Sequence, residues 1–177
     1  IIDNSEYILP VWILNRWKKI YGELTTKSII KCLTNEPYLD ITIKKKYNKI
    51  FNDYDPVVLP NNSIRLKKLN KISSLPMYNQ GKWWVQDAAA TIPANLLINK
   101  LQNIQNIGIV LDACAAPGGK SMQLLSAGLN VISIDHDKKR INIMKNNLNR
   151  IGLNHSIVNA NYLEWKDSSN NISGILL

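Results

Sequence analysis

The stretch from Asp112 to Lys120 combines residue types that suit the binding of a small molecule by a backbone turn. Its sequence, Asp-Ala-Cys-Ala-Ala-Pro-Gly-Gly-Lys, follows an apolar run at 107–111 and precedes a helix-like run at 121–127. Small residues and glycines let a turn approach a ligand without Cβ clashes, and the free N–H groups at a helix start attract electron-rich groups. The sequence therefore predicts a cofactor-binding loop between a strand and a helix.

The spacing of the glycines argues against a ligand held by its phosphates. A dinucleotide loop has Gly-x-Gly-x-x-Gly, and a P-loop has Gly-x-x-x-x-Gly-Lys-Ser/Thr. Here only Gly118 and Gly119 occur, directly after Pro117. A nucleoside ligand without phosphates fits better, and S-adenosylmethionine is the candidate cofactor.

Asp135 ends the next apolar run, 23 positions after Asp112. A carboxylate at the end of the second strand of a nucleotide-binding fold accepts hydrogen bonds from ribose hydroxyls. Taken alone, the residue is equally consistent with a helix N-cap or a turn. Because it follows the predicted loop at this distance, we interpret it as the ribose ligand.

The elements that must position this site alternate between strands and helices from Gly81 onward. Apolar runs predict strands at 107–111, 130–134, 155–158 and 173–177, and apolar side chains three or four apart predict helices at 87–101, 120–127 and 137–151. Such alternation is typical of an α/β fold with a mainly parallel sheet, helices on both faces and a ligand at the carboxyl ends of the strands.

The first part of the chain has a different pattern. Helical spacing at 10–21 and 25–33 is followed by alternating residues at 38–44, and two short apolar runs flank the turn at 60–62. We therefore expect a helical lead-in (1–34), a small α+β subdomain (35–76) and a Rossmann-like domain (77–177).

The chain is basic, with 22 Lys and Arg against 13 Asp and Glu and a formal charge of +9. This charge suits a polyanionic partner such as RNA, although a basic surface also serves solubility alone. The small subdomain concentrates the basic residues, which form either an RNA-facing surface or a solvated face. The candidates for RNA contact are Lys44, Lys45, Lys46, Arg65, Lys67 and Lys68.

Several classes of protein and site are disfavoured. Cys32 and Cys114 lie far apart, which gives no disulfide framework or cysteine metal site, and His136 and His155 have no partner at metal or triad spacing. No apolar run approaches the ~20 residues of a membrane span. We expect a cytoplasmic monomer without metal. Because residue 1 is not Met and 174–177 resembles the start of a buried strand, we also expect a fragment of a longer protein.

Several motifs together resemble the RsmB/Sun family of S-adenosylmethionine-dependent rRNA cytosine-5 methyltransferases. The resemblance covers most of the chain and is carried most specifically by the loop. The matching segments are Cys114–Lys120, Trp84–Ala90, Ser133–Asp135, Pro10–Leu14 and Glu36–Thr42. It implies a methyltransferase fold of the Rossmann-like type preceded by a small RNA-binding subdomain.

The resemblance also implies roles for individual residues. Asp135 becomes the ribose ligand, and Asn161 stands near the adenine where the family usually has Asp; an amide still donates and accepts there. Gln86 and Asp87 would pack beside the pocket, although Asp87 is also a plausible helix N-cap. The loop around the methionine part of the cofactor consists of Cys114, Ala115, Ala116, Pro117, Gly118, Gly119 and Lys120.

The implied reaction is methyl transfer to C5 of a cytosine in ribosomal RNA, through a covalent adduct between a cysteine and C6. In the family the acid lies in an Asp-Ala-Pro-Cys turn and the nucleophile in a Thr-Cys-Ser turn, and we expect both beyond Leu177. Although a cysteine at a helix start can be activated, we interpret Cys114 as a packing residue. The alternatives are a methyltransferase acting on a protein or small molecule, and a non-catalytic RNA-binding module.

Overall fold

The computed structural model describes residues 8–35, 37–44, 50–67, 71–166 and 171–177. The chain divides into two compact units, Ile1–Tyr38 and Leu39–Leu177. In the first unit, helices α1 (Val11–Tyr21) and α2 (Glu23–Leu33) pack against each other. Gly22 separates them with φ +78 and donates its backbone N–H to Lys18 O at 3.0 Å. The two helices predicted for this part of the sequence are confirmed.

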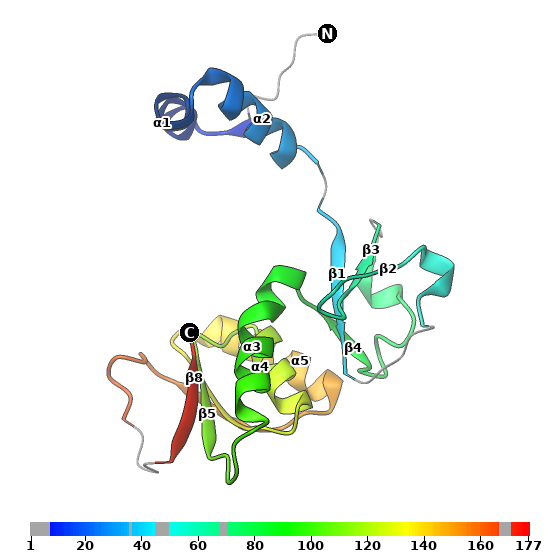
Figure 1. Cartoon of the computed structure of the whole chain (residues 1–177), viewed down its shortest axis with the longest axis vertical. Coiled ribbons are helices and arrows are strands. Elements are labelled where there is room, and N and C mark those ends of the chain that lie inside the picture. Colours follow the sequence, from blue (N-terminus) through cyan, green and yellow to red (C-terminus); the bar gives the residue numbers. More distant parts are fainter. Residues whose placement is uncertain (1–7, 36, 45–49, 68–70, 167–170) are drawn as a thin grey trace. The chain divides into compact units, whose positions relative to one another are not determined.

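The second unit contains a small antiparallel sheet (Figure 1). Its strands are β1 (Leu39–Ile43), β2 (Val57–Val58), β3 (Ile64–Leu66) and β4 (Trp83–Val85), in the order β2-β3-β1-β4. Two short 3-10 helices, η2 (Asn52–Tyr54) and η3 (Ile72–Ser74), lie in the connections. Strand β4 comes from beyond residue 76 and pairs with β1, so the small sheet draws on sequence on both sides of that position.

A cluster of apolar side chains forms the core of the small sheet. Ile41, Leu66 and Trp83 are fully buried, and Phe51 packs its ring edge-on against Trp83 with 5.7 Å between the ring centroids. Aromatic pairs prefer this edge-to-face geometry because the ring edge is positive and the face negative. Trp83 and its neighbour Trp84 point to opposite faces of β4 and are both buried, so neither is exposed for stacking on a base.

The second sheet is parallel throughout, with strands β5 (Ile109–Ala113), β6 (Asn130–Asp135), β7 (Ser156–Asn159) and β8 (Ile172–Leu176) in the order β7-β6-β5-β8. Helices α3 (Ala88–Leu101), α4 (Gly119–Ser126) and α5 (Lys138–Ile151) accompany it. Parallel crossovers are right-handed, so α4 and α5 share one face, and α3 packs against α4. The predicted α/β class with a parallel sheet is confirmed, and the helices that the structure describes in this unit gather on that face.

The ends of the helices follow from local sequence. The carboxylates of Asp87 and Asp137 each accept two backbone N–H bonds at the starts of α3 and α5, as N-cap residues do. Gly152 ends α5 with φ +68, a left-handed conformation that favours glycine. In the described part of the chain, no helix has the length and apolar character to cross a membrane.

The end of α5 docks on the small sheet. The guanidinium of Arg150 lies 4.0 Å from the ring centroid of Tyr78 and donates to Tyr78 O at 2.8 Å and Trp83 O at 3.1 Å. Gly81, with φ +62, leaves no room for a Cβ, which would lie 1.9 Å from Arg150 O. These contacts hold the antiparallel sheet against the parallel one.

Candidate functional site

The predicted cofactor loop connects β5 to α4 at the carboxyl end of the parallel sheet. Cys114 (φ +65) and Gly118 (φ +103) have left-handed backbones, which is uncommon for a residue with a Cβ. Ala115 donates its N–H to Ile134 O at 3.0 Å, and Gly118 donates to Ala115 O at 2.9 Å. The loop is therefore a closed turn tied to the end of β6.

This loop lines a cavity of about 880 Å³. The volume lies within the range of pockets that hold small molecules or cofactors. Trp84, Val85 and Gln86 form part of the wall, and the small side chains of Ala115 and Ala116 leave the backbone accessible to a ligand. The predicted loop residues that line the cavity are Cys114, Ala115, Ala116, Pro117, Gly119 and Lys120.

Helix α5 contributes side chains that sequence analysis missed. Arg140 donates from Nη2 to Ala116 O, and Asn147 donates from Nδ2 to Pro117 O at 3.1 Å. Both side chains and Arg150 line the cavity. In the sequence, these residues lie on the polar face of the helix, opposite its apolar stripe. A polar face of this kind is usually solvent-exposed, so it did not indicate a binding role. In the structure it clamps the carbonyls of the loop.

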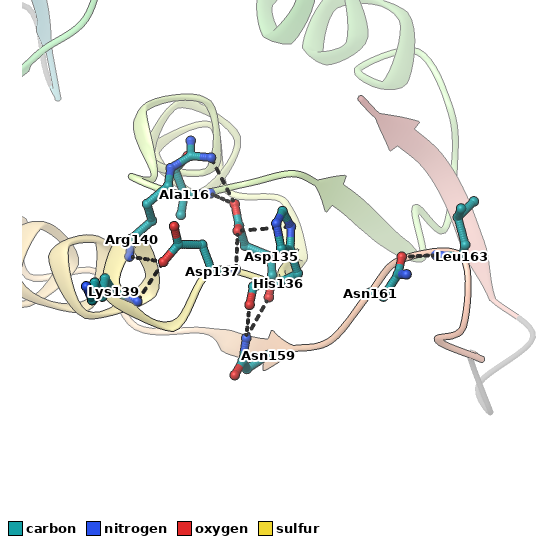
Figure 2. Close-up of polar contacts among 9 residues, drawn as sticks. All are labelled: Ala116, Asp135, His136, Asp137, Lys139, Arg140, Asn159, Asn161 and Leu163. Carbon is teal, nitrogen blue, oxygen red and sulfur yellow. Dashed lines mark hydrogen bonds and ion pairs between the residues drawn. The ribbon is translucent and has the colours of Figure 1, made fainter.

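Asp135 lies beneath the loop rather than in the cavity wall. Its Oδ2 accepts the N–H of Ala116 at 3.0 Å, and its Oδ1 accepts the N–H of Asp137 at 2.9 Å (Figure 2). Arg140 Nη1 lies 3.9 Å from Oδ2 of Asp135, and the side chain of Asp135 is only 2% exposed. A ribose could reach this carboxylate only if the loop shifted, because solvent hardly touches it in this conformation.

Asn161 lies apart from Asp135, after the end of β7. Its Oδ1 accepts the N–H of Leu163 at 3.1 Å, and its Nδ2 donates to Glu164 at 3.3 Å, so its side chain closes a local turn (Figure 2). Asn159 instead links the strand ends, because it donates to the backbone oxygens of Asp135 and His136, both at 3.0 Å. Asn159 was not singled out from the sequence, where an Asn at a strand end carries no distinct signal.

Asp112, at the foot of the loop, is 2% exposed and accepts a hydrogen bond from Ser121 Oγ. Burial raises the pKa of this carboxyl to about 6, against the lowering effects of the Ser121 hydrogen bond and the Lys120 charge. The charge of Asp135 raises it further. The carboxyl therefore changes charge near neutral pH, directly below the loop.

Gln86 anchors the wall between the two sheets. Its Oε1 accepts from Trp84 Nε1 at 2.7 Å and from Thr42 Oγ1 at 3.1 Å, while its Nε2 donates to Gln123 Oε1 at 2.5 Å. Every one of these groups is buried or partly buried, so a broken bond would leave a polar atom without a partner. The network ties β1 and β4 of the small sheet to α4, the helix that follows the loop.

The basic residues predicted to contact RNA have internal partners where the structure describes them. Arg65 forms two 2.7 Å bonds to the buried carboxylate of Asp40 and lowers its pKa. Lys44 Nζ donates to Ile151 O at 2.7 Å, at the carboxyl end of α5, and the exposed Lys67 pairs with Asp55 at 2.5 Å. The other three lie outside the described residues: Lys45, Lys46 and Lys68.

Cysteine and metal chemistry find little support in the described residues. Cys32 and Cys114 are free and exposed. Within the ranges given above, no three His, Cys, Asp or Glu side chains are placed to share a metal ion. Cys114 differs from a simple packing residue in that it is exposed and lines the cavity.

Comparisons with known proteins point to a methyltransferase family. Residues 99–177 match the family model described as 16S rRNA methyltransferase RsmB/F. A ribosomal RNA small subunit methyltransferase B from Shewanella oneidensis is 35% identical over 181 residues, covering 92% of this chain and 40% of that protein. A probable one from Coxiella burnetii is 31% identical over 167 residues, covering 85% and 36%. The chain thus spans well under half the length of these relatives.

Two solved structures share the fold. NSun6 from Pyrococcus horikoshii, solved with SFG, gives a TM-score of 0.71 at 15% identity over 86% of this chain and 65% of that one. A methyltransferase homolog protein from Pyrococcus horikoshii gives 0.64 at 19% over 88% and 54%. At these identities the likeness concerns the fold. The resemblance predicted from the sequence is confirmed: residues 99–177 match the RsmB/F methyltransferase family model.

Proposed function

We propose that this chain carries the cofactor-binding part of an S-adenosylmethionine-dependent enzyme that methylates C5 of a cytosine in small-subunit ribosomal RNA. The observation that carries the proposal is the closed loop at 114–120, which lines a cavity of suitable volume at the carboxyl end of a parallel sheet. The family match supports the reaction, and a structural neighbour solved with SFG, an analogue of S-adenosylmethionine, supports the cofactor.

In this proposal the loop binds the methionine part of the cofactor. The small side chains of Ala115 and Ala116 let the backbone make close contact, and the N–H groups at the start of α4 face an electron-rich group. S-adenosylmethionine supplies an electrophilic methyl group when it is bound. Arg140 and Asn147 of α5 hold the carbonyls of Ala116 and Pro117, which fixes the curvature of the turn.

Asp135 has two tasks in the proposal. Each carboxylate oxygen accepts one backbone N–H and retains a second lone pair that can accept a ribose hydroxyl. Ligand entry would lift the loop enough to expose these lone pairs. Asn161 would contact the adenine only after its bond to Leu163 N is exchanged, so we expect it to contribute less affinity than Asp135.

The catalytic groups of this reaction are proposed to lie outside the 177 residues. C5 of cytosine is a weak nucleophile, so a thiolate must add to C6 first, and an acid and a base must then move protons at N3 and C5. Neither cysteine of the chain has a neighbouring general base among its described contacts. We therefore assign no catalytic residue to this chain.

The RNA surface is proposed for the basic small sheet. The formal charge of +9 favours a polyanion, and Lys67 is the described candidate whose ammonium is most exposed. A ribosomal RNA substrate also implies action in the cytoplasm. We further propose that the chain works as a monomer and without a metal ion.

Photolabelling tests the cofactor assignment. The chain is irradiated in the presence of radiolabelled S-adenosylmethionine and digested, and the labelled peptides are identified. We expect the label on the peptide containing 114–120, and we expect S-adenosylhomocysteine, but not ATP, to compete. Label spread over surface peptides, or equal competition by ATP, would refute the assignment. In a second assay, methyl transfer to ribosomal RNA by the chain alone would refute the placement of the catalytic cysteine elsewhere.

A further inference from the structure

A continuous line of hydrogen bonds runs from Asp112 in β5, through Ser121 and Ser133, to His155, which directly precedes β7. Ser121 Oγ bonds to Asp112 Oδ2, Ser121 Oγ and Ser133 Oγ lie 2.8 Å apart, and Ser133 Oγ lies 2.7 Å from His155 Nε2. Both serines are fully buried, and His155 is half-buried. Two titratable groups, one in β5 and one directly before β7, are thus connected by two hydroxyls.

The direction of these bonds follows from the charge of Asp112. An ionised carboxylate can only accept, so Ser121 must donate to it, Ser133 must donate to Ser121, and His155 must donate from Nε2. Nδ1 of His155 then carries no proton, and this nitrogen is buried without a partner. When Asp112 is protonated, the order reverses and Nε2 becomes the acceptor. The tautomer of His155 and the charge of Asp112 are therefore coupled.

We propose that Ser121 and Ser133 form a proton relay that lets the imidazole of His155 set the charge of the buried carboxyl of Asp112. A proton taken up at Nδ1 moves the Nε2 proton to Ser133, the Ser133 proton to Ser121 and the Ser121 proton to Asp112. Each hydroxyl gains one proton and loses one, so the only net change is a neutral Asp112 and a His155 with its proton on Nδ1.

The surroundings of both ends suit this exchange. Lys120 at the start of α4 and Asp135 at the end of β6 act on the charge of Asp112 in opposite directions. Around His155, Lys145 of α5 lines the same small cavity of about 330 Å³. Burial lowers the pKa of His155 and raises that of Asp112, which brings the two pKa values toward each other. The free-energy difference between a proton on the imidazole and a proton on the carboxyl is therefore smaller than it is for the two groups in water.

The relay has a consequence for the site that rests on the proposed function. S-adenosylmethionine carries a positive sulfonium and S-adenosylhomocysteine does not. An ionised Asp112 below the loop would favour the charged cofactor over the neutral product, and protonation would remove that preference. The relay would thus couple cofactor discrimination to pH.

Nuclear magnetic resonance of the 177-residue chain tests the relay without any ligand. We follow the ring nitrogens of His155 and the carboxyl carbon of Asp112 between pH 4 and 8. We expect the proton on Nε2 at high pH, and a change at the His155 nitrogens at the same midpoint as the Asp112 titration. In Ser133→Ala, Asp112 should still titrate while the His155 step at that midpoint disappears.

The matched control is Ser126→Ala, which removes a buried hydroxyl of α4 that has no partner and should leave both curves unchanged. A proton on Nδ1 at high pH, or a His155 step that survives in Ser133→Ala, would overturn the relay. Affinities for the two ligands test the link to function separately. The affinity for S-adenosylmethionine divided by that for S-adenosylhomocysteine should fall about threefold between pH 8 and pH 5. If this ratio stays constant while the relay is intact, only the link to cofactor discrimination is refuted.

Discussion

At the carboxyl ends of β5 and β6, polar groups converge on a single turn, whereas the charged groups of the antiparallel sheet each bond to a separate partner. Asp135 and Arg140 both hold Ala116, but Asp40 pairs with Arg65 and Lys44 caps α5. The parallel topology forces strand ends together, so residues at those ends meet wherever the chain folds this way. Basic composition has no such geometric consequence.

A basic charge pattern is therefore weaker evidence of a binding surface than a turn at the carboxyl ends of parallel strands. Sequence analysis predicted that the loop binds a ligand, and it left the basic residues of the small subdomain open between an RNA-facing surface and a solvated face. The loop residues share one cavity, while Arg65 and Lys44 are occupied by contacts that stabilise the fold. A cluster of lysines and arginines therefore supports RNA binding only after internal partners have been counted.

Gly81→Ala should disrupt the docking of the two sheets. The new Cβ would lie 1.9 Å from Arg150 O at a position with φ +62, so the backbone must move, and we expect a loss of about 4 kcal/mol in the free energy of unfolding. Urea denaturation measures it. The matched control is Gly128→Ala, where φ is +84 but nothing lies within 4 Å; an equal loss in both variants would show that backbone strain, not docking, is responsible.

Asp112→Asn should change how stability depends on pH. The pKa of Asp112 is raised to about 6 in the folded state, so the wild type loses stability as pH rises from about 4 to about 6 and keeps that loss above 6. The variant has no such charge, and its stability relative to wild type should improve by up to about 3 kcal/mol from pH 4 to pH 8. Urea denaturation of both proteins at pH 4 and pH 8 measures the difference in their free energies of unfolding. If this difference is the same at both pH values, the burial of an ionised carboxylate at Asp112 is contradicted.

Asp40→Ala should weaken the small sheet by about 2 kcal/mol, because it removes the carboxylate that accepts two hydrogen bonds from Arg65 and one from Ala88 N. The side chain of Arg65 is 35% exposed, and water therefore moderates the loss. Asp55→Ala breaks the exposed pair with Lys67 and should barely change the urea midpoint. If both variants lost the same stability, Asp40 would have no special structural role.

Lys44→Met should lower stability by about 1 kcal/mol, since it removes a donor to Ile151 O at the negative end of α5. Lys139→Met, at the positive end of the same helix, should not lower the stability.

Filter binding to a ribosomal RNA fragment tests whether these lysines contact RNA. Lys67→Met should reduce the salt dependence of RNA affinity by about one ion, while Lys44→Met should leave it unchanged; the reverse result would restore Lys44 as an RNA contact.

Local sequence was sufficient for much of the fold. The helices predicted at 87–101 and 137–151 begin at the N-cap residues Asp87 and Asp137, and the small residues of 114–120 predicted the turn. Each of these signals depends on the conformation of a few adjacent residues. Such features can be predicted because the backbone geometry and the residue that satisfies it lie within one turn of each other.

Contacts between distant segments could not be predicted in this way. Nothing in the sequence indicated that β4 would pair with β1, or that Arg65 would find Asp40. The position of Asn161 was predicted from a family pattern, but its side chain bonds within its own turn. Short polar side chains readily bond to nearby backbone, and this local competition decides where they point.

Calorimetry with S-adenosylmethionine can show whether the loop held by Asp135 binds an adenosyl cofactor. The folded chain should take up one equivalent, Asp135→Asn should bind at least about tenfold more weakly, and Asp55→Asn should bind as the wild type does. Circular dichroism would confirm that each variant is folded. No uptake by the folded wild type, or unchanged affinity in Asp135→Asn, would contradict the account.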